Sequence, residues 1–400
     1  MLIMVIGALL LAPSVHGLDW PHWRGAEFNG ISKESDWSAD WPDTGPKVIW
    51  RASVGTGYSS FSIGQRRVFT VGNNQNQETV YCFEEETGAE IWHHSFACPL
   101  DPKYYEGGPS ATPTIDGARV YYLSRKGHLM CLDAATGKVH WQKNIAQELN
   151  AAISTWGFAS SPVIRGNALF INVGSAGTAL DKETGKVLWS SGKKGAGYSS
   201  AVPFQQDGHK ALAWMTGKAV KAVAEADGTI LWQHTWKTRY DVNAADPICR
   251  GNQIFISSGY NQGCALLEIR GGKIRVVWQN KAMRNHFNSC VYIDGYLYGF
   301  DEADLKCLDW KTGDEKWSQG GLGKGALMAA DGKLIVLGGN GILTVAPASP
   351  SSFLPTARAQ ILGKTCWSTP VLANGRIYCR NSKGQVVCLD ARPPSGSPVL

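Results

Sequence analysis

Tryptophan recurs along this chain with a nearly constant spacing. Seven of the sixteen tryptophans lie 39 to 49 residues apart, namely Trp50, Trp92, Trp141, Trp189, Trp232, Trp278 and Trp317. Five of them end one phrase, a Thr-Gly or Asp-Gly pair followed by a short apolar run, as in 183–189. A period of this length, kept over most of the chain, is typical of a repeat architecture.

Each phrase predicts a tight turn followed by a β-strand. Glycine allows a positive φ without steric cost, and the adjacent Thr or Asp can hydrogen-bond the turn backbone. Upstream, 161–171 alternates apolar positions around a second turn, so each period contains four short antiparallel strands and almost no helix. This pattern predicts an all-β, eight-bladed β-propeller. The blade cores are expected at 58–92, 110–141, 160–189, 199–232, 244–278, 287–317, 325–362 and 367–390.

The two ends of the repeat region are each incomplete. The eighth blade stops near Asp390 without a final Trp strand, whereas 46–50 is a Trp-ending strand without a blade. The N-terminal strand is therefore expected to complete blade eight and close the ring, which removes two exposed sheet edges. In blade seven, the prolines of 346–350 predict a loop between the third and fourth strands.

The expected organisation is one propeller domain at 46–391, preceded by a leader at 18–45 and followed by a tail at 392–400. Residues 1–17 form a short apolar run that ends in small residues, which predicts a signal peptide. The alternative is a membrane anchor, but about 12 apolar residues are fewer than the ~20 that span a bilayer. The protein is expected to be secreted or periplasmic, with no integral membrane segment after cleavage.

Charge and cysteine content restrict the possible functions. The net charge of +6 contains no block of like charges, so nucleic-acid binding is not expected. Four cysteines share one repeat position in different blades, too far apart to bridge, and are expected in the core: Cys82, Cys131, Cys307 and Cys388. The sequence leaves the disulfide state of six others open: Cys98, Cys249, Cys264, Cys290, Cys366 and Cys379.

The phrase at 179–189 resembles the repeat of the pyrroloquinoline quinone (PQQ)-like β-propellers, an eight-bladed family. The leader at 20–25, Trp-Pro-His-Trp-Arg-Gly, resembles that of secreted PQQ-like repeat proteins, which are similar to the assembly propeller BamB. The resemblance implies two classes of function. One is a quinoprotein dehydrogenase that holds PQQ and calcium in the central funnel, and the other is a scaffold that binds peptides or proteins.

The resemblance favours the second class. Quinoprotein dehydrogenases carry a vicinal Cys pair over the cofactor and long insertions between blades, and this chain has neither. We expect a non-enzymatic scaffold for a protein or small-ligand partner, with no cofactor, no metal site and no catalytic residue. The alternative is a divergent oxidoreductase of alcohols or sugars that uses PQQ and calcium, and a third possibility is a carbohydrate-binding module.

The segments that enter the innermost strand of each blade converge on the central channel, and they depart from the repeat. Polar and aromatic residues are concentrated there, including Tyr58, Tyr198 and Phe287. The residues predicted to bind a ligand are Glu106, Trp156, Tyr240, Asp241, Asn243, Arg284, His286, Lys324 and Trp367. The alternative is that these groups fill the channel with hydrogen bonds and ordered water, His286 being satisfied by neighbours such as Asn243.

Overall fold

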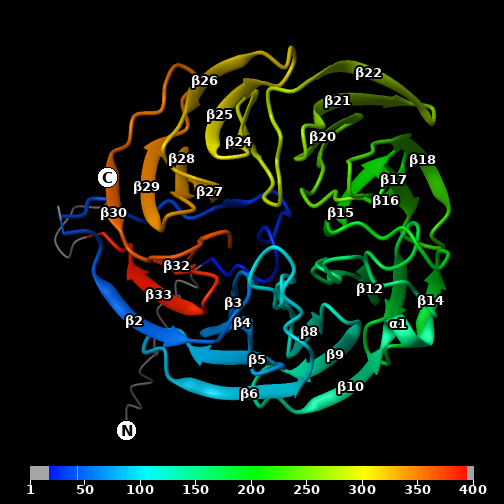
Figure 1. The fold of residues 1–400 in the computed structure, drawn as a ribbon, viewed down its shortest axis with the longest axis horizontal. Coiled ribbons are helices and arrows are strands. Elements are labelled where there is room, and N and C mark those ends of the chain that lie inside the picture. The colour runs from blue at the N-terminus through cyan, green and yellow to red at the C-terminus, as the bar shows by residue number, and fades with distance from the viewer. Residues whose placement is uncertain (1–17, 43, 394–400) are drawn as a thin grey trace, which may run out of the picture.

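The computed structural model describes residues 18–42 and 44–393, and these form a ring of eight β-sheets (Figure 1). Seven sheets have four strands, and the eighth has a fifth strand at its inner edge. All pairings within the four-stranded blades are antiparallel, so the predicted fold class is confirmed.

Blades one to four follow one another along the chain. Blade one contains β3 (Ser62–Gly64), β4 (Arg67–Asn74), β5 (Gln77–Glu84) and β6 (Glu90–Ala97). Blade two contains β7 (Thr114–Asp116), β8 (Arg119–Leu123), β9 (His128–Asp133) and β10 (Val139–Asn144), followed by the one short helix of the described residues, α1 (Ile145–Glu148). Blade three contains β11 (Val163–Arg165), β12 (Ala168–Ile171), β13 (Thr178–Asp181) and β14 (Val187–Ser190). Blade four contains β15 (Val202–Gln206), β16 (His209–Met215), β17 (Ala219–Ala224) and β18 (Ile230–Thr235).

Blades five to eight complete the circle. Blade five contains β19 (Ile248–Arg250), β20 (Gln253–Ser258), β21 (Gly263–Arg270) and β22 (Lys273–Asn280). Blade six contains β23 (Val291–Ile293), β24 (Tyr296–Asp301), β25 (Asp304–Asp309) and β26 (Glu315–Gln319). Blade seven contains β27 (Ala326–Ala330), β28 (Lys333–Leu337), β29 (Ile342–Pro347) and β30 (Ala357–Gln360). Blade eight contains β31 (Val371–Ala373), β32 (Arg376–Arg380), β33 (Gln385–Asp390) and the N-terminal β2 (Val48–Ser53).

The ring closes as the sequence predicts. β2 pairs antiparallel with β33, with Trp50 opposite Cys388, so blade eight takes its outer strand from the start of the chain. The predicted loop in blade seven is also present, because β29 ends at Pro347 and β30 begins at Ala357. A feature that the sequence did not reveal is β1 (Ile31–Ser32), which pairs in parallel with β27.

The repeat turns link neighbouring blades through tryptophan. In blade two, the Asp133 carboxylate accepts hydrogen bonds from the Thr136 backbone (2.9 Å) and hydroxyl (2.8 Å), which fixes the turn. Gly137 follows with a φ of 72°, and a Cβ there would lie 2.6 Å from the ring of Trp92 in blade one. Trp92 also donates from Nε1 to the Ala134 carbonyl at 3.1 Å. The glycine therefore serves the turn and also leaves room for the tryptophan of the preceding blade.

Trp232 is the exception, because its Nε1 donates to the Gln206 side chain of its own blade. The next blade, blade five, joins β21 to β22 through Gly271 and Gly272 and lacks the Thr-Gly phrase. Blade seven also lacks the phrase, but its Ser349 carbonyl still accepts from Trp317 at 2.8 Å.

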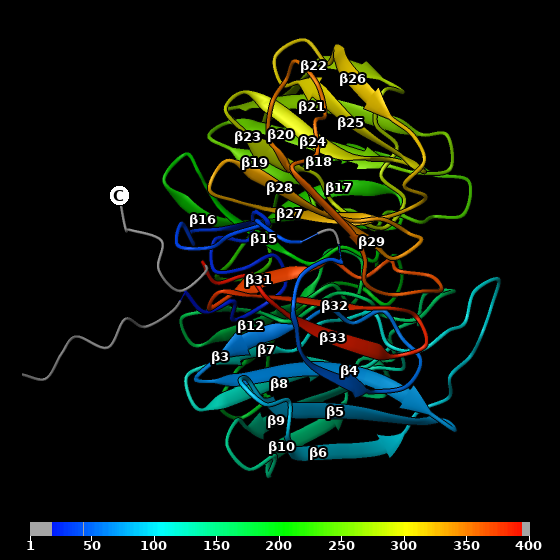
Figure 2. The same ribbon diagram turned by 90° about the vertical axis from the view of Figure 1, so that its left-hand side faces the viewer.

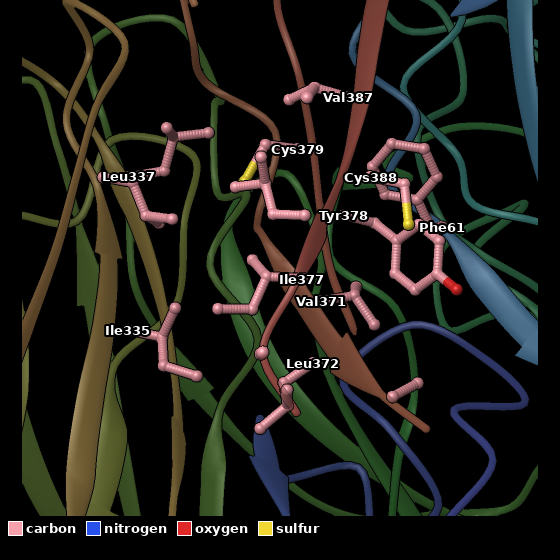
Figure 3. Close-up of a cluster of buried hydrophobic side chains, with 14 of the residues drawn as sticks. Phe61, Ile335, Leu337, Val371, Leu372, Ile377, Tyr378, Cys379, Val387 and Cys388 are labelled. Atoms are coloured by element: carbon pink, nitrogen blue, oxygen red, sulfur yellow. The ribbon is translucent and has the colours of Figure 1, made fainter. Parts of the chain in front are cut away.

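The hydrophobic core is divided among the junctions between neighbouring blades. Figure 3 shows the largest cluster, where Ile335 and Leu337 of blade seven face Ile377 of blade eight. Phe61, which leads into blade one, packs on Tyr378 with ring centroids 5.9 Å apart. All ten cysteines are free thiols, and the four at the shared repeat position are buried as predicted.

The leader runs across one end of the ring. Trp20 forms a β-bridge with Ile63, and Arg24 donates to the Cys290 carbonyl at 2.8 Å. In Figure 2 this dark blue segment lies at the left-hand end, and the cyan connection between β6 and β7 projects at the opposite end. The predicted signal peptide, 1–17, lies outside the described residues.

Candidate functional site

Two sets of connections meet at the end of the ring away from the leader, here called the mouth. In a four-stranded antiparallel blade, the first and third strands begin at the same end. The connections between blades and the turns between second and third strands therefore all lie at the mouth. The Thr-Gly turns lie at the other end, here called the closed end, together with the leader.

A cavity of about 690 Å³ occupies the centre of the ring. Trp23 of the leader lines its floor and donates from Nε1 to Asp246 Oδ2 at 2.6 Å. Tyr104, which is fully exposed, lies at the mouth. The leader thus closes one end of the channel and leaves a blind cavity that opens at the mouth.

Seven rings form a continuous wall along this cavity, which we call the aromatic arc. Consecutive ring centroids lie 4.6 to 5.5 Å apart, the range of favourable aromatic contacts. In order, the arc contains Tyr105, Tyr58, Trp367, Phe287, His286, Tyr260 and Tyr240. Opposite connections add Trp156 and Tyr198, whose centroids are 6.2 Å apart. The cavity therefore offers many flat apolar faces with hydroxyl groups at their edges.

A charged pair lies beside the arc. The Lys324 ammonium is 2.7 Å from Glu302 Oε2 and 2.8 Å from His286 Nδ1. The contacts of Glu302 with His286 and then with Lys324 lower the pKa of its carboxyl to about 2, so it is ionised at neutral pH. His286 Nδ1 lies between these two groups, 3.1 Å from Glu302 Oε2, to which a protonated Nδ1 donates, and within reach of the Lys324 ammonium, from which an unprotonated Nδ1 accepts.

A second carboxylate lies at the floor. Asp246 accepts from the Ser200 backbone at 2.7 Å, and it is 4.0 Å from the buried Arg24. Burial is the largest influence and raises the pKa of Asp246 to about 6. The floor is therefore held by a carboxylate whose charge depends on pH near neutrality.

Five of the nine predicted site residues line the cavity together. These are Trp156, Tyr240, His286, Lys324 and Trp367. The predicted partner of His286 is different in the structure, since Glu302 and Lys324 take the place suggested for Asn243.

The other four do not line the cavity. Glu106 lies behind the wall and accepts hydrogen bonds from Tyr58 and from Ser382. Asp241 points to solvent and pairs with Lys218 at 3.5 Å.

Asn243 and Arg284 serve the scaffold. Asn243 is fully buried, and its amide donates to three backbone carbonyls. Arg284 forms a bidentate pair with Asp301, at 2.6 and 2.9 Å. This pair ties the β22–β23 connection to the end of β24.

Sequence reasoning missed Glu302 and Tyr260 because both lie in turns between second and third strands. Only the connections between blades were considered, although strand direction places both sets at the mouth. Asp246 and Trp23 were missed for another reason. Nothing in the sequence shows that the leader crosses the channel.

Eight four-stranded blades around one axis, with a cavity at the centre, define the class of eight-bladed β-propellers. The family model described as the outer membrane protein assembly factor BamB, with PQQ-like repeats, matches residues 76–319. The chain belongs to this family.

Individual relatives agree with this assignment. BamB of Yersinia pestis, named an outer membrane protein assembly factor, is 24% identical over 364 residues, which cover 85% of this chain and 88% of the relative. The crystal structure of BamB from Moraxella catarrhalis has a TM-score of 0.63 at 14% identity, covering 86% of this chain and 99% of that one. Quinohemoprotein alcohol dehydrogenase from Comamonas testosteroni has a TM-score of 0.67 at 13% identity, covering 96% of this chain and 82% of the enzyme. The two structures share the fold with this chain.

The acidic groups around the cavity bear on the alternative in which PQQ and calcium are bound. Within residues 18–42 and 44–393, no group of three or more His, Cys, Asp or Glu side chains could hold a metal ion. The two carboxylates nearest the cavity, Asp246 and Glu302, already pair with Arg24 and Lys324. Nor does any helix among the described residues have the length and apolar character needed to cross a membrane.

Proposed function

We propose that this protein is a non-enzymatic binding scaffold that holds a protein or small-ligand partner at the mouth of its central cavity. The observation that supports this most strongly is the aromatic arc, which brings rings from six separate connections to one wall. Such a wall supplies contact area at low conformational cost, and the few fixed polar groups beside it give orientation.

The family supports the same proposal. The relative from Yersinia pestis is named an outer membrane protein assembly factor, a name that is consistent with a binding role. We also propose that the protein is exported to the periplasm or beyond, on the basis of the apolar segment at 1–17.

The test uses a photo-crosslinking amino acid in place of Tyr104 at the mouth, with the same group in place of Leu354, a 68% exposed residue of the blade seven loop. Both proteins are irradiated in an extract of the source organism, and adducts are identified by mass spectrometry. We expect one specific adduct at position 104 and none at 354. Equal labelling at the two positions would contradict a site at the mouth.

A divergent oxidoreductase is the competing function. Purified protein is mixed with PQQ and calcium, and cofactor absorbance and dye-linked oxidation of alcohols and sugars are measured. The scaffold proposal predicts neither stoichiometric absorbance nor turnover. Saturable binding with turnover would replace it.

A further inference from the structure

The two ends of the ring carry opposite charge. The mouth connections contain thirteen Lys or Arg residues against six Asp or Glu, whereas acidic residues outnumber basic ones in the leader and the turns of the closed end. Most of the basic groups at the mouth are solvent-exposed. The sequence showed no basic block because these residues come from separate connections that meet only in the folded ring.

Six exposed lysines define what we call the basic rim. They are Lys193, Lys194, Lys218, Lys281, Lys364 and Lys383. Lys193 lies next to the cavity entrance, because its carbonyl accepts from the Ala152 backbone in the connection that carries Trp156. Of the six, Lys218 pairs with a mouth carboxylate, and no ion pair is found for the other five among the described residues.

The interior of the cavity is electrically balanced. Lys324 pairs with Glu302 at 2.7 Å, and Asp246 faces Arg24 at 4.0 Å. A charged group on a ligand would therefore gain little electrostatic binding energy inside the cavity and more at the basic rim. The charge pattern favours an occupant whose buried part is neutral and whose emerging part is anionic.

The inner wall favours sugar rings over a purely apolar group. The hydroxyls of Tyr240, Tyr260, Thr155 and Ser110 line the cavity and make no hydrogen bond to the other described residues. An apolar occupant would remove water from these groups without replacing its hydrogen bonds, which costs about 1–3 kcal/mol for each fully buried group. A sugar supplies hydroxyls at its edge and C–H groups on its faces, and so fits both the hydroxyls and the aromatic arc.

The cavity also limits the shape of the occupant. Trp23 and Asp246 close the floor, so a polymer cannot pass through the ring. The volume of about 690 Å³ lies in the range of small-molecule sites, about 300–1,000 Å³. Only the end of a chain can enter, and the rest must cross the rim.

We propose, building on the proposed function above, that the mouth binds the end of an acidic polysaccharide. The aromatic arc stacks against the terminal sugar rings, and the basic rim pairs with carboxylate or sulfate groups further along the chain. No bond is made or broken.

The test is calorimetric titration of the whole protein with a panel of oligomers of matched length. The panel contains oligogalacturonate as the carboxylate arm, a sulfated oligosaccharide as the sulfate arm, a neutral malto-oligosaccharide, polyglutamate and single-stranded DNA. At least one acidic saccharide should bind at one site and at least tenfold more tightly than the neutral one. Its Kd should rise at least tenfold between about 50 and 500 mM NaCl, because rim contacts are screened.

Three variants separate the contributions. Tyr240→Ala should raise the Kd for acidic and neutral saccharides alike by tenfold or more, since it removes a ring of the aromatic arc. The double variant Lys193→Gln with Lys194→Gln should raise the Kd for the acidic saccharide by about fivefold and leave that for the neutral saccharide unchanged. The control is Arg250→Gln with Lys311→Gln at the closed end, which removes the same charge and should leave the Kd unchanged.

Several outcomes would overturn the proposal. Binding of polyglutamate or DNA as tight as that of the acidic saccharide would show that charge alone is recognised. If the control variant at the closed end raises the Kd as much as the rim variant does, the acidic saccharide binds nonspecifically over the whole surface. If no saccharide binds while the crosslinker at position 104 captures an identified protein, this inference fails and the proposed scaffold function remains.

Discussion

The closed end and the mouth are built from the same eight blades, yet they follow different rules. At the closed end, five of the eight blades repeat the Thr-Gly or Asp-Gly phrase, and the glycine of that phrase lies under a tryptophan of the preceding blade. At the mouth, the connections between blades share no common phrase and most differ in length, and aromatic and basic side chains accumulate. The repeated residues specify the scaffold, so the segments that depart from the repeat mark the surface that is free to bind.

Deletion of residues 20–50 should have the largest effect, because it removes the floor of the cavity and the first half of the closing strand β2. We expect loss of the cooperative thermal transition, measured by circular dichroism. A truncated protein that melts at the full-length temperature would show that neither the closed ring nor the leader stabilises the fold.

Removal of a repeat tryptophan should be the next largest effect. Trp92→Ala empties a large buried site at the junction of blades one and two and should cost about 3–5 kcal/mol in free energy of unfolding. Trp141→Ala and Trp189→Ala should cost somewhat less, because both rings are only partly buried. Urea titration measures all three, and values within about 1 kcal/mol of wild type would refute the packing role.

The turn glycines test whether tryptophan packing or backbone conformation requires them. At Gly137, an added Cβ must adopt a positive φ and would also collide with the Trp92 ring. At Gly117, φ is positive as well, at 55°, but no atom lies within 4 Å of an added Cβ. Gly117→Ala should lower the free energy of unfolding by about 1–2 kcal/mol, because alanine must adopt the left-handed conformation there. The loss at Gly137 should be larger by at least about 1 kcal/mol. Equal losses would mean that the ring moves aside freely.

The two carboxylates should respond to pH in opposite senses. Burial raises the pKa of Asp246 from 3.8 to about 6, so the folded state binds more protons than the unfolded state between these values, and stability falls as pH rises through them. The free energy of unfolding of Asp246→Asn, relative to that of wild type, should therefore increase as pH rises from about 4 to about 7.

Glu302 has the opposite sign. Its pKa is lowered from 4.5 to about 2, so its contribution is present above pH 4.5 and is lost as pH falls toward 2. The stability deficit of Glu302→Gln relative to wild type should therefore grow as pH rises from about 2 to about 4.5 and stay constant above that. Urea midpoints at each pH measure both differences, and parallel curves would contradict the assigned environments.

Substitutions at the mouth should change stability least. His286→Ala and Trp156→Ala should stay within about 1–2 kcal/mol of wild type, because both side chains face the cavity rather than a blade junction. Both should abolish binding of the ligand identified by titration. If the two variants unfold instead, these residues are a structural plug.

The sequence predicts the scaffold well because its signals are local and repeated. The Thr-Gly turns, the strand alternation and the Trp at 50 were enough to predict eight blades and the strand that closes them. The site was only partly predictable, because it depends on what meets in space. Asn243 and Trp156 look alike as departures from the repeat, yet one bonds three buried carbonyls and the other faces the cavity. Glu302 gave no signal, because a carboxylate in a tight turn is ordinary until Lys324 lies beside it.

The pairing of β2 with β33 has a consequence for biosynthesis. β2 leaves the ribosome more than 300 residues before its partner strand. At about 5–20 residues per second, this delay is on the order of tens of seconds. Throughout that time the first strand has no partner, and Trp50 cannot pack between blade eight and Gly88 of blade one. Nascent chains are therefore vulnerable to pairing with one another through this strand, and a chaperone that shields residues 46–53 would protect the whole ring.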